Sequence, residues 1–486
     1  MLAQLLAKKT DFSDADASEG PCLKRTLGPW GLTALGIGAV IGGGIFVITG
    51  QAAAEHAGPA IILAFVIAAV CCSFSALCYA EFATLIPMSG SSYSYAYATL
   101  GEGVAWFIGW NMVLEYGVSA SAVAVSWTGY FTSLLEHFGL HLPDALTNAP
   151  LAFKDNHLVA TGALFNLPAV IIVLLLTWLC YVGIRESSGA NLFMVVLKVA
   201  LILIVIIAGW RYVDPALWHP FIPPAQGPDK YGWSGVLRGA AMVFFAYIGF
   251  EATSTAAQEA KNPQRDLPIG TLVSLAVCTI LYIGMAAVLT GLLPYDQLGT
   301  TEPVVTAVRA HAELGWLRIV VEIGALIGLS SVILVMIIAQ PRIFMIMGRD
   351  GLLPPVFAKI HPRYCTPYIN TVITGIGIAT LAAIFPLDVL GDLVSMGTLI
   401  AFSAVCAGVW ILRHTWPDAP RTFRVPWAPL ICTLGVASCA LLLSTMSWYN
   451  WTLMVVWTVI GTAIYFGYGR RHSKLHLRST AGGGSR

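Results

Sequence analysis

The sequence predicts an all-α integral membrane protein with twelve transmembrane helices. Three observations support this fold class: the composition, the spacing of the apolar runs and the distribution of the basic residues. Of the 486 residues, 57% are hydrophobic and only 10% are charged, so the chain carries more apolar surface than a soluble protein of this length can bury. We therefore expect lipid to cover much of the surface.

The apolar residues fall in repeated runs of about 20 residues, the length that crosses a hydrocarbon core of about 30 Å. Twelve runs are expected to span the membrane, with approximate limits 30–55, 60–86, 102–132, 164–184, 189–210, 232–258, 267–293, 316–347, 367–385, 389–412, 427–446 and 449–468. About 22 mostly polar residues precede the first run, and no small-residue cleavage pattern follows it. The first span is therefore expected to be retained rather than removed as a signal peptide.

The basic residues are distributed unevenly between the loops. If the N-terminus is cytoplasmic, about three quarters of the 26 lysines and arginines fall in cytoplasmic segments, as the positive-inside rule requires. This distribution predicts a multi-pass protein of the cell (plasma) membrane with both termini in the cytoplasm. One basic residue, Lys198, lies inside a span rather than in a loop.

The composition and motifs also exclude several classes of function. A net charge of +1 argues against a nucleic-acid partner. The ten cysteines lack metal-type spacing and are expected to pack as small apolar residues. The sequence contains no HExxH, GxSxG or Walker motif. We therefore expect neither an enzyme nor a metal site, and no cofactor beyond a proton gradient as energy source.

Residues 36–50, GIGAVIGGGIFVITG, place three consecutive glycines at the centre of the first span. Glycine lowers helix stability by about 1 kcal/mol relative to alanine, and lipid cannot satisfy the backbone groups that a break would free. One interpretation is close helix packing, for which Gly38 and Gly42 have the small-xxx-small spacing. The other is a discontinuous helix whose exposed amides and carbonyls bind a ligand. Three adjacent glycines cover every direction round a helix, which favours the second interpretation.

The sixth span, AMVFFAYIGFEATSTAA, offers a second interruption, with Gly249 beside an intramembrane Glu251. Five spans separate the two interrupted segments, so they enter the membrane from opposite sides. Interruptions in corresponding positions of two halves are typical of inverted repeats.

Three motifs together resemble the amino acid-polyamine-organocation (APC) permeases, and most closely the bacterial members of the cationic amino acid transporter family. They are IGGGIF in the first span, FFAYIGFEATSTAAQEAKNPQRDLPIG across the sixth, and GRDGLLPPVFAKIHPRYCTP after the eighth. The resemblance runs from about Leu23 to Gly469. One position departs from the family pattern, because relatives often carry a hydroxyl residue where this chain has Gly43.

The resemblance implies a leucine-transporter-like fold with discontinuous spans 1 and 6. It divides the chain into a cytoplasmic N-terminal tail (1–25), a first inverted repeat of spans 1–5 (26–212), a second of spans 6–10 (213–414), spans 11–12 (415–469) and a cytoplasmic C-terminal tail (470–486). The substrate site is implied at mid-membrane, between spans 1 and 6.

The two breaks suit a zwitterion without any charged side chain. The free N–H groups at the start of the second half of span 1 suit a carboxylate, while carbonyls freed in spans 1 and 6 suit an ammonium group. The expected substrate-binding residues line these breaks and the pocket walls: Val40, Ile41, Gly42, Gly43, Gly44, Phe245, Ile248, Phe250, Glu115, Leu329 and Ser330.

Lys198 and Glu251 are the expected proton-coupling residues. A lysine at bilayer centre costs roughly 2.5 to 3.5 kcal/mol on insertion scales and should face the bundle interior. Burial disfavours its charged form, so it can exchange protons, and the resemblance suggests that its ammonium contacts span 1 where related transporters bind sodium. A structural lysine bonded to helix-end carbonyls is the alternative.

The expected function is secondary active transport, with proton-coupled uptake of L-amino acids by alternating access. Exchange of amino acids or amines is the alternative that the sequence leaves open. The expected partners are a small-molecule L-amino acid, protons and the lipid bilayer, and a small membrane subunit is a further candidate.

Overall fold

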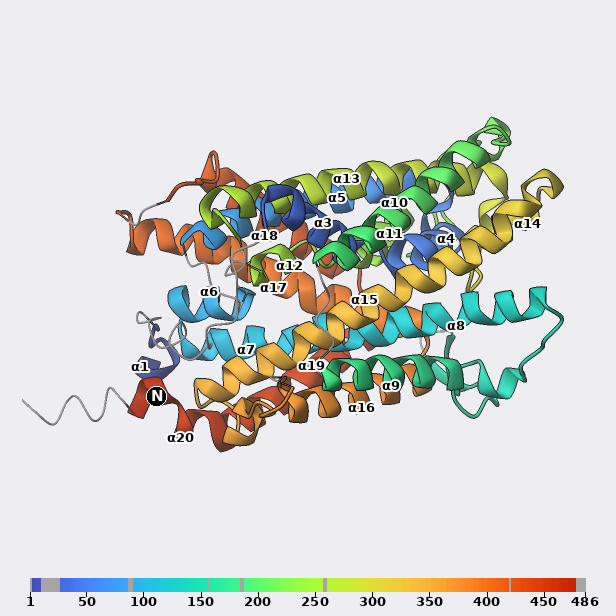
Figure 1. Cartoon of the computed structure of the whole chain (residues 1–486). Helices are drawn as coiled ribbons and strands as arrows, with labels where there is room; N and C mark the ends of the chain where they lie inside the picture. The colour runs from blue at the N-terminus through green and yellow to red at the C-terminus, as the bar shows by residue number, and fades with distance from the viewer. Residues whose placement is uncertain are drawn as a thin grey trace, which may run out of the picture.

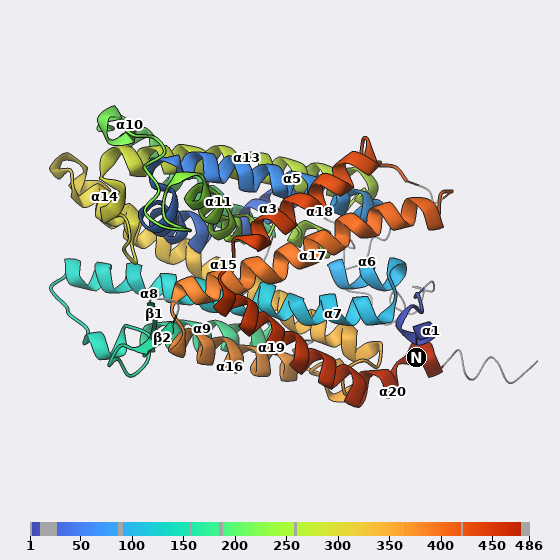
Figure 2. The same ribbon diagram turned by 180° about the vertical axis from the view of Figure 1, so that it is seen from behind.

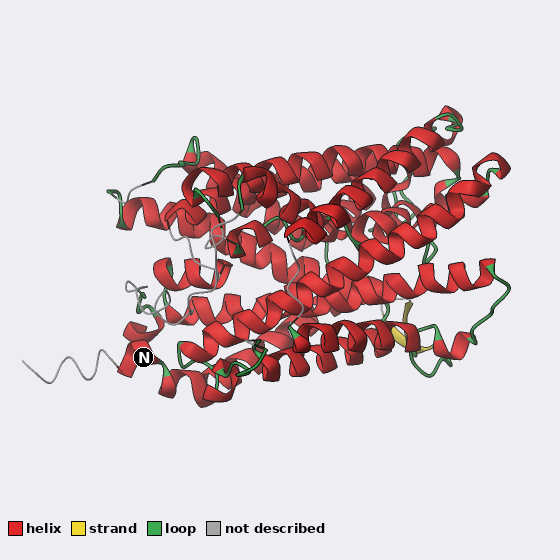
Figure 3. Ribbon diagram, in the orientation of Figure 1, coloured by secondary structure: helices red, strands yellow, loops and turns green. Residues whose placement is uncertain are grey.

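The computed structural model describes residues 2–9, 27–85, 91–154, 157–183, 188–256, 260–364, 366–418 and 421–477. Most of the predicted N-terminal tail and the end of the predicted C-terminal tail lie outside these residues. The described part is a bundle of long helices that run roughly lengthwise through the molecule (Figure 1). Figure 3 shows how little of it is not helical.

Helix covers each of the twelve segments in which a span was expected. The helices of the first half are α3 (Pro29–Val40), η1 (Gly44–Ile48), α4 (Thr49–Ala52), η2 (Ala53–Ala57), α5 (Ile61–Leu85), α7 (Glu102–Val113), η4 (Leu114–Val118), α8 (Ser119–His137), α9 (Leu167–Val182) and α10 (Ser188–Trp210). Those that follow are α11 (Gly232–Val243), η7 (Phe244–Tyr247), α12 (Ala252–Thr255), α13 (Pro263–Leu292), α15 (Gly315–Arg349), α16 (Tyr368–Ile384), α17 (Leu387–Thr415), α18 (Ala428–Ser444), α19 (Trp448–Ile464) and η12 (Tyr465–Gly469).

Shorter helices lie outside the expected spans. They are α1 (Leu2–Leu5), η3 (Gly58–Ala60), α6 (Ser91–Thr99), η5 (Asp144–Leu146), η6 (Pro215–Trp218), η9 (Tyr295–Gln297), α14 (Pro303–Arg309), η10 (Ala312–Leu314), η11 (Pro355–Ala358) and α20 (Arg470–His472). Seven helical stretches in the described residues are long and apolar enough to cross a membrane, and four further apolar helices have 10–17 residues. The chain is therefore a multi-pass membrane protein.

One hairpin departs from the expected all-α fold. Strands β1 (Leu151–Lys154) and β2 (His157–Ala160) pair antiparallel between α8 and α9, with Leu151 opposite Ala160. The hairpin lies at the end of the bundle remote from α1 and α20 (Figure 2). Its few residues alternate too briefly for the sequence to reveal a strand.

The helix ends follow local sequence signals. Proline occupies the first turn of α3, α9, α13 and α14, where its missing N–H leaves no bond unmade. Asn166 caps α9 by accepting a hydrogen bond from the Ala169 N–H at 3.2 Å. The same helix ends at Gly183, whose φ of 81° is the left-handed conformation that glycine adopts most easily.

The core brings together helices that are distant in sequence. α13 packs against α5 and α3, and α15 packs against α8. Both α1 and α20 lie at one end of the bundle, and α14 lies at the other (Figure 1). This arrangement surrounds the interrupted first and sixth spans with α8, α10, α13, α15 and α17.

Candidate functional site

The backbone of the first span leaves the helical conformation at the predicted position. α3 ends at Val40, and Ile41 is extended, with φ −74° and ψ 100°. A short π-helix begins at Gly44. The expectation of a discontinuous first span is therefore confirmed.

The three glycines of this break each approach a different neighbouring helix. A Cβ on Gly42 would lie 3.2 Å from a methyl of Val332 in α15, and one on Gly43 would lie 3.0 Å from the Ser126 hydroxyl in α8. A Cβ on Gly44 would overlap the backbone of Ala246 in the sixth span. Packing thus excludes a side chain at Gly44, whereas at Gly42 and Gly43 the neighbouring side chain would have to shift by a few tenths of an ångström. The packing interpretation therefore holds alongside the break.

The sixth span is interrupted at the same depth. η7 ends at Tyr247, Ile248 is extended with ψ 131°, and Gly249 has a φ of 122°. The Gly249 N–H donates to the Glu251 carboxylate at 3.0 Å. A Cβ on Gly249 would lie 2.8 Å from the carbonyl carbon of Ala39, so the two breaks touch each other.

Lys198 reaches the first break from α10. Its ammonium donates to the carbonyls of Gly38 at 2.8 Å and Ile41 at 3.0 Å, and the residue is 1% exposed. The expected contact between this lysine and the carbonyls of span 1 is confirmed. These bonds satisfy both the buried ammonium and the carbonyls at the end of α3. Lipid has no hydrogen-bonding group that could replace either partner.

Tyr282 of α13 joins the two breaks and was missed by the sequence reasoning. Its hydroxyl lies 2.9 Å from the Val40 carbonyl and 2.8 Å from the Ala246 carbonyl. A phenol has one proton, so it donates to one of these carbonyls at a time. The only signal in the sequence was a tyrosine inside an apolar span. The sequence could not indicate that this tyrosine bonds to residues 242 and 36 positions away.

Several carbonyls that were expected to bind the substrate ammonium already accept hydrogen bonds from the protein. The carbonyls of Val40 and Ile41 accept from Tyr282 and Lys198, and the Phe245 carbonyl accepts from the Ile248 N–H at 3.2 Å. Each carbonyl oxygen has two lone pairs. A bound ammonium group would therefore share these oxygens with the protein rather than have them to itself.

Two buried carboxyl groups meet beside the sixth-span break. Glu115 lies in the π-helical segment η4 and faces Glu251, and the two residues are 1% and 0% exposed. Both Glu115 oxygens and Oε1 of Glu251 have no hydrogen-bond partner among the described residues. The hydroxyls of Tyr116 and Thr398 are also buried without a partner in the described chain. Buried polar groups of this kind are normally satisfied, which makes the two carboxyl groups candidates for contact with substrate or water.

The expected pocket walls differ in their surroundings. Phe250 packs edge-on against Tyr79, and its ring centroid lies 5.2 Å from that of Phe402. It therefore belongs to an aromatic cluster beside the sixth-span break. Leu329 is fully buried, and the Ser330 hydroxyl accepts from the Trp127 indole at 3.0 Å. The residue of α15 that meets the glycine break is Val332, which the sequence reasoning did not select.

Polar contacts lie on the side of the site that faces the hairpin end of the bundle. The Tyr130 hydroxyl donates to the Phe46 carbonyl at 2.7 Å, and Glu322 accepts from Arg318 at 2.9 Å and Ser133 at 2.6 Å. A cavity of about 510 Å³ lies beyond them, between α8, the start of α17 and the hairpin, and Glu55 is among its lining residues. Glu322 is thus held by ion pairs and hydrogen bonds, as expected of a structural acid.

At the opposite end, the described segments nearest the two termini are attached to the helix bundle. Lys9 forms an ion pair with Asp350 at 2.6 Å, and the Tyr93 hydroxyl donates to the same carboxylate at 2.8 Å. Glu102 accepts from Tyr465 at 2.8 Å and also from Ser473 of the C-terminal segment. These contacts close the end of the bundle at which the termini lie.

Comparison with known proteins identifies the family. Residues 27–468 match the family model described as amino acid permease. The chain belongs to the amino acid permease family. It is 47% identical over 454 residues to the branched-chain amino acid permease BcaP of Bacillus subtilis (strain 168), covering 93% of this chain and 95% of that protein. The family consists of transporters, so this permease is not an enzyme.

Two further relatives show the range of the family. The methylthioribose transporter of Bacillus subtilis (strain 168) is 45% identical over 475 residues, with 98% of this chain and 100% of that protein covered. The vacuolar cationic amino acid transporter 4 of Arabidopsis thaliana is 37% identical over 412 residues, covering 85% of this chain and 67% of the relative. The predicted resemblance to APC permeases is confirmed.

Proposed function

We propose that this permease takes up L-amino acids by proton-coupled symport, with the zwitterion bound where the first and sixth spans are broken. The observation that carries the proposal is the contact of the two breaks with each other and with Lys198. Amides, carbonyls and a titratable cation thus meet in one buried place. Substrate and proton can therefore influence the same backbone segment.

The proposed architecture has twelve crossings, built as two five-span inverted repeats followed by two C-terminal spans. The helices that cover all twelve expected segments support it, as do two breaks that lie five spans apart. The repeats would comprise residues 26–212 and 213–414, with both tails cytoplasmic in the plasma membrane. Membership of the amino acid permease family agrees with this architecture.

The carboxylate would bind at the start of η1. The first N–H groups of a helix have no intrahelical acceptor, and the positive end of the helix dipole favours an anion there. Gly43 offers no side-chain hydroxyl, but the Ser126 hydroxyl lies 3.0 Å from the position of a Cβ at residue 43. Backbone amides, with this serine beside them, would hold the carboxylate.

Proton coupling would act through the bonds of Lys198. A charged ammonium donates to two carbonyls of the first span. Loss of its proton would remove the charge that ties α10 to the end of α3, so protonation and the conformation of the break would be linked. The facing carboxyl groups of Glu115 and Glu251 would hold a proton between them, because two buried like charges repel strongly.

A hydroxylated substrate is the second candidate, and one observation favours it. The buried Tyr116 hydroxyl and the neighbouring Glu115 carboxyl have no hydrogen-bond partner in the described residues. A neutral ligand with several hydroxyl groups could satisfy them better than a branched aliphatic side chain. One relative is named for methylthioribose and another for branched-chain amino acids, so the transport assay must include both chemistries.

The proposal is tested by transport into liposomes that contain the purified permease. A labelled panel of L-amino acids and methylthioribose would be offered with an inward proton gradient and no sodium, with and without a protonophore. Accumulation that the protonophore abolishes is the expected result. Uptake only into liposomes preloaded with amino acid would establish exchange instead, and accumulation of methylthioribose alone would replace the amino acid as substrate.

A further inference from the structure

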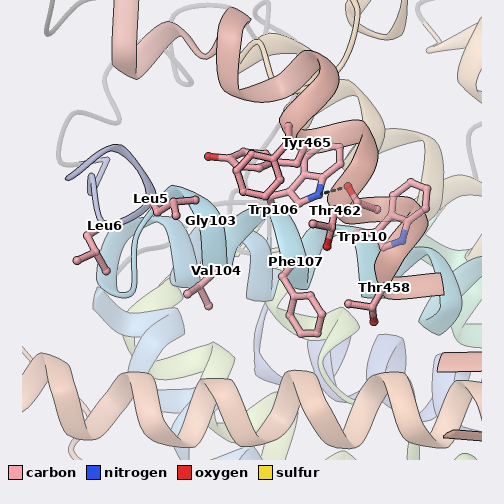
Figure 4. Close-up of a pocket in the computed structure, with 12 residues that line it drawn as sticks. Leu5, Leu6, Gly103, Val104, Trp106, Phe107, Trp110, Thr458, Thr462 and Tyr465 are labelled. Atoms are coloured by element: carbon pink, nitrogen blue, oxygen red, sulfur yellow. Dashed lines mark hydrogen bonds between the residues drawn. The ribbon is translucent and has the colours of Figure 1, made fainter. Parts of the chain in front are cut away.

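An apolar groove lies where α1, α7, α19 and η12 meet (Figure 4). It has a volume of about 250 Å³, and its lining includes Leu5 of α1, Val104, Trp106 and Phe107 of α7, and Phe466 of η12. No charged side chain lines it within the described chain. The groove joins the N-terminal segment, the third span and the end of the twelfth.

The walls of this groove are fixed by two tryptophans. The Trp106 indole donates to the Gly461 carbonyl at 2.9 Å, and the Trp110 indole donates to the Trp457 carbonyl at 2.9 Å. A Cβ on Gly461 would overlap the Trp110 ring. Because these bonds hold α7 against α19, the groove is a built feature of the bundle rather than a gap between mobile side chains.

Basic residues follow closely in the chain after two segments that line the groove. Lys8 follows three residues after Leu5, and Arg470 and Arg471 begin one turn, about 6 Å, beyond Phe466. None of the three forms an ion pair with a described residue. Phe466 is 37% exposed, so the apolar lining reaches the surface beside these charges.

We propose that this groove binds an anionic phospholipid of the cytoplasmic leaflet, with an acyl chain along the tryptophans and the phosphate between the basic residues. The small volume of about 250 Å³ favours a slender chain, because one turn of an α-helix, about 10–12 Å across and 5.4 Å long, already occupies roughly 400–600 Å³. Basic pockets between helices on the cytoplasmic side bind anionic headgroups for the same electrostatic reason.

The lipid would also connect the two chain termini. Its chain would touch Leu5 of the N-terminal helix and Phe466 near the C-terminus. These segments already meet, since the Gln4 side chain donates to the Arg470 carbonyl at 2.7 Å. Anionic lipid would therefore stabilise the closed terminal end of the permease, independently of which substrate it carries.

The headgroup is tested by lipid titration of the delipidated, full-length permease in detergent, with thermal stability as readout. Phosphatidylglycerol should stabilise at a lower half-saturating concentration than phosphatidylcholine with the same chains. Each basic residue near a membrane is worth about 1 kcal/mol, or about fivefold in affinity. The double variant Arg470→Gln/Arg471→Gln should thus bind phosphatidylglycerol roughly 25-fold more weakly. The control Lys359→Gln/Arg363→Gln, which removes two exposed charges elsewhere, should leave this affinity unchanged.

Binding of the acyl chain in the groove is tested by filling the groove with a larger side chain. Thr458 lines the groove and Thr452, on the same helix, does not. Thr458→Trp should abolish the selective effect of phosphatidylglycerol, while Thr452→Trp should retain it. Equal effects of both lipids, an unaltered response of Thr458→Trp, or full stabilisation by glycerol phosphate without acyl chains would each overturn the proposal. Co-purification of a small membrane helix that Thr458→Trp displaces would also overturn it.

Discussion

Replacement of Lys198 by methionine separates proton coupling from substrate binding. Methionine keeps an unbranched chain of similar length in the buried space but removes the ammonium. The variant loses two hydrogen bonds from a charged donor, at 2.8 and 3.0 Å. Such bonds contribute about 1.5–3 kcal/mol each, and the variant is partly compensated because it no longer buries a charge. We therefore expect it to fold, with moderately lowered thermal stability.

The effect on coupling is larger and can be calculated. A gradient of one pH unit stores about 1.4 kcal/mol per proton, which drives tenfold accumulation in a symporter that moves one proton with each substrate. Without the titratable group, Lys198→Met should not raise the internal substrate concentration above the external one. Exchange of labelled for unlabelled substrate should persist, because the amides of the first break remain.

The assay compares the wild type, Lys198→Met and Lys261→Met in the same liposomes. Lys261 is exposed and controls for removal of a positive charge. Uptake driven by an inward proton gradient is measured beside exchange at equal pH. Tenfold, protonophore-sensitive accumulation by Lys198→Met would falsify the role of this lysine in coupling. Loss of exchange together with accumulation would identify it as a purely structural clamp.

Three further predictions follow from particular contacts. Gly43→Val places a branched side chain against a serine of α8, so uptake should fall at least tenfold at normal membrane insertion, whereas Gly377→Val, with open space around its Cβ, should transport normally; equal uptake by both variants would contradict the steric argument. Tyr282→Phe leaves two buried carbonyls without their shared donor, which should cost about 1–3 kcal/mol of stability; an unchanged melting temperature would show that the bridge contributes nothing. Lys9→Ala breaks the ion pair with Asp350 and should raise hydrogen exchange at residues 2–9 without altering it in α13; unaltered protection of that segment would refute its attachment through this pair.

Much of the fold was predictable because lipid imposes simple requirements on a sequence. Each expected span contains helix, and the first break occurs at the glycines that predicted it. The hairpin after α8 was missed, since strands of four residues lack a readable period. The same reasoning found Lys198, Glu115 and Glu251, because charge inside a span is rare.

The site was predictable only in part. The two interpretations of the glycines are compatible, because Gly44 both follows the break and packs against the backbone of Ala246. Tyr282 and Val332 were missed because an apolar or amphipathic residue in a span carries no sign of the direction in which it points. Ser330 was placed by its position in the eighth span, and the structure shows its bond to Trp127.

The sequence by itself determined that the chain crosses the membrane many times, where two helices must break, and which buried charges need partners. These properties follow from length, composition and the cost of an unsatisfied group in lipid. Only the tertiary structure decided which groups meet: Lys198 bonds to Gly38 and Ile41, 160 and 157 residues away, and Glu115 lies near Glu251. Hydrogen bonds and packing act over a few ångströms in space, and helices distant in the chain must assemble before those distances exist.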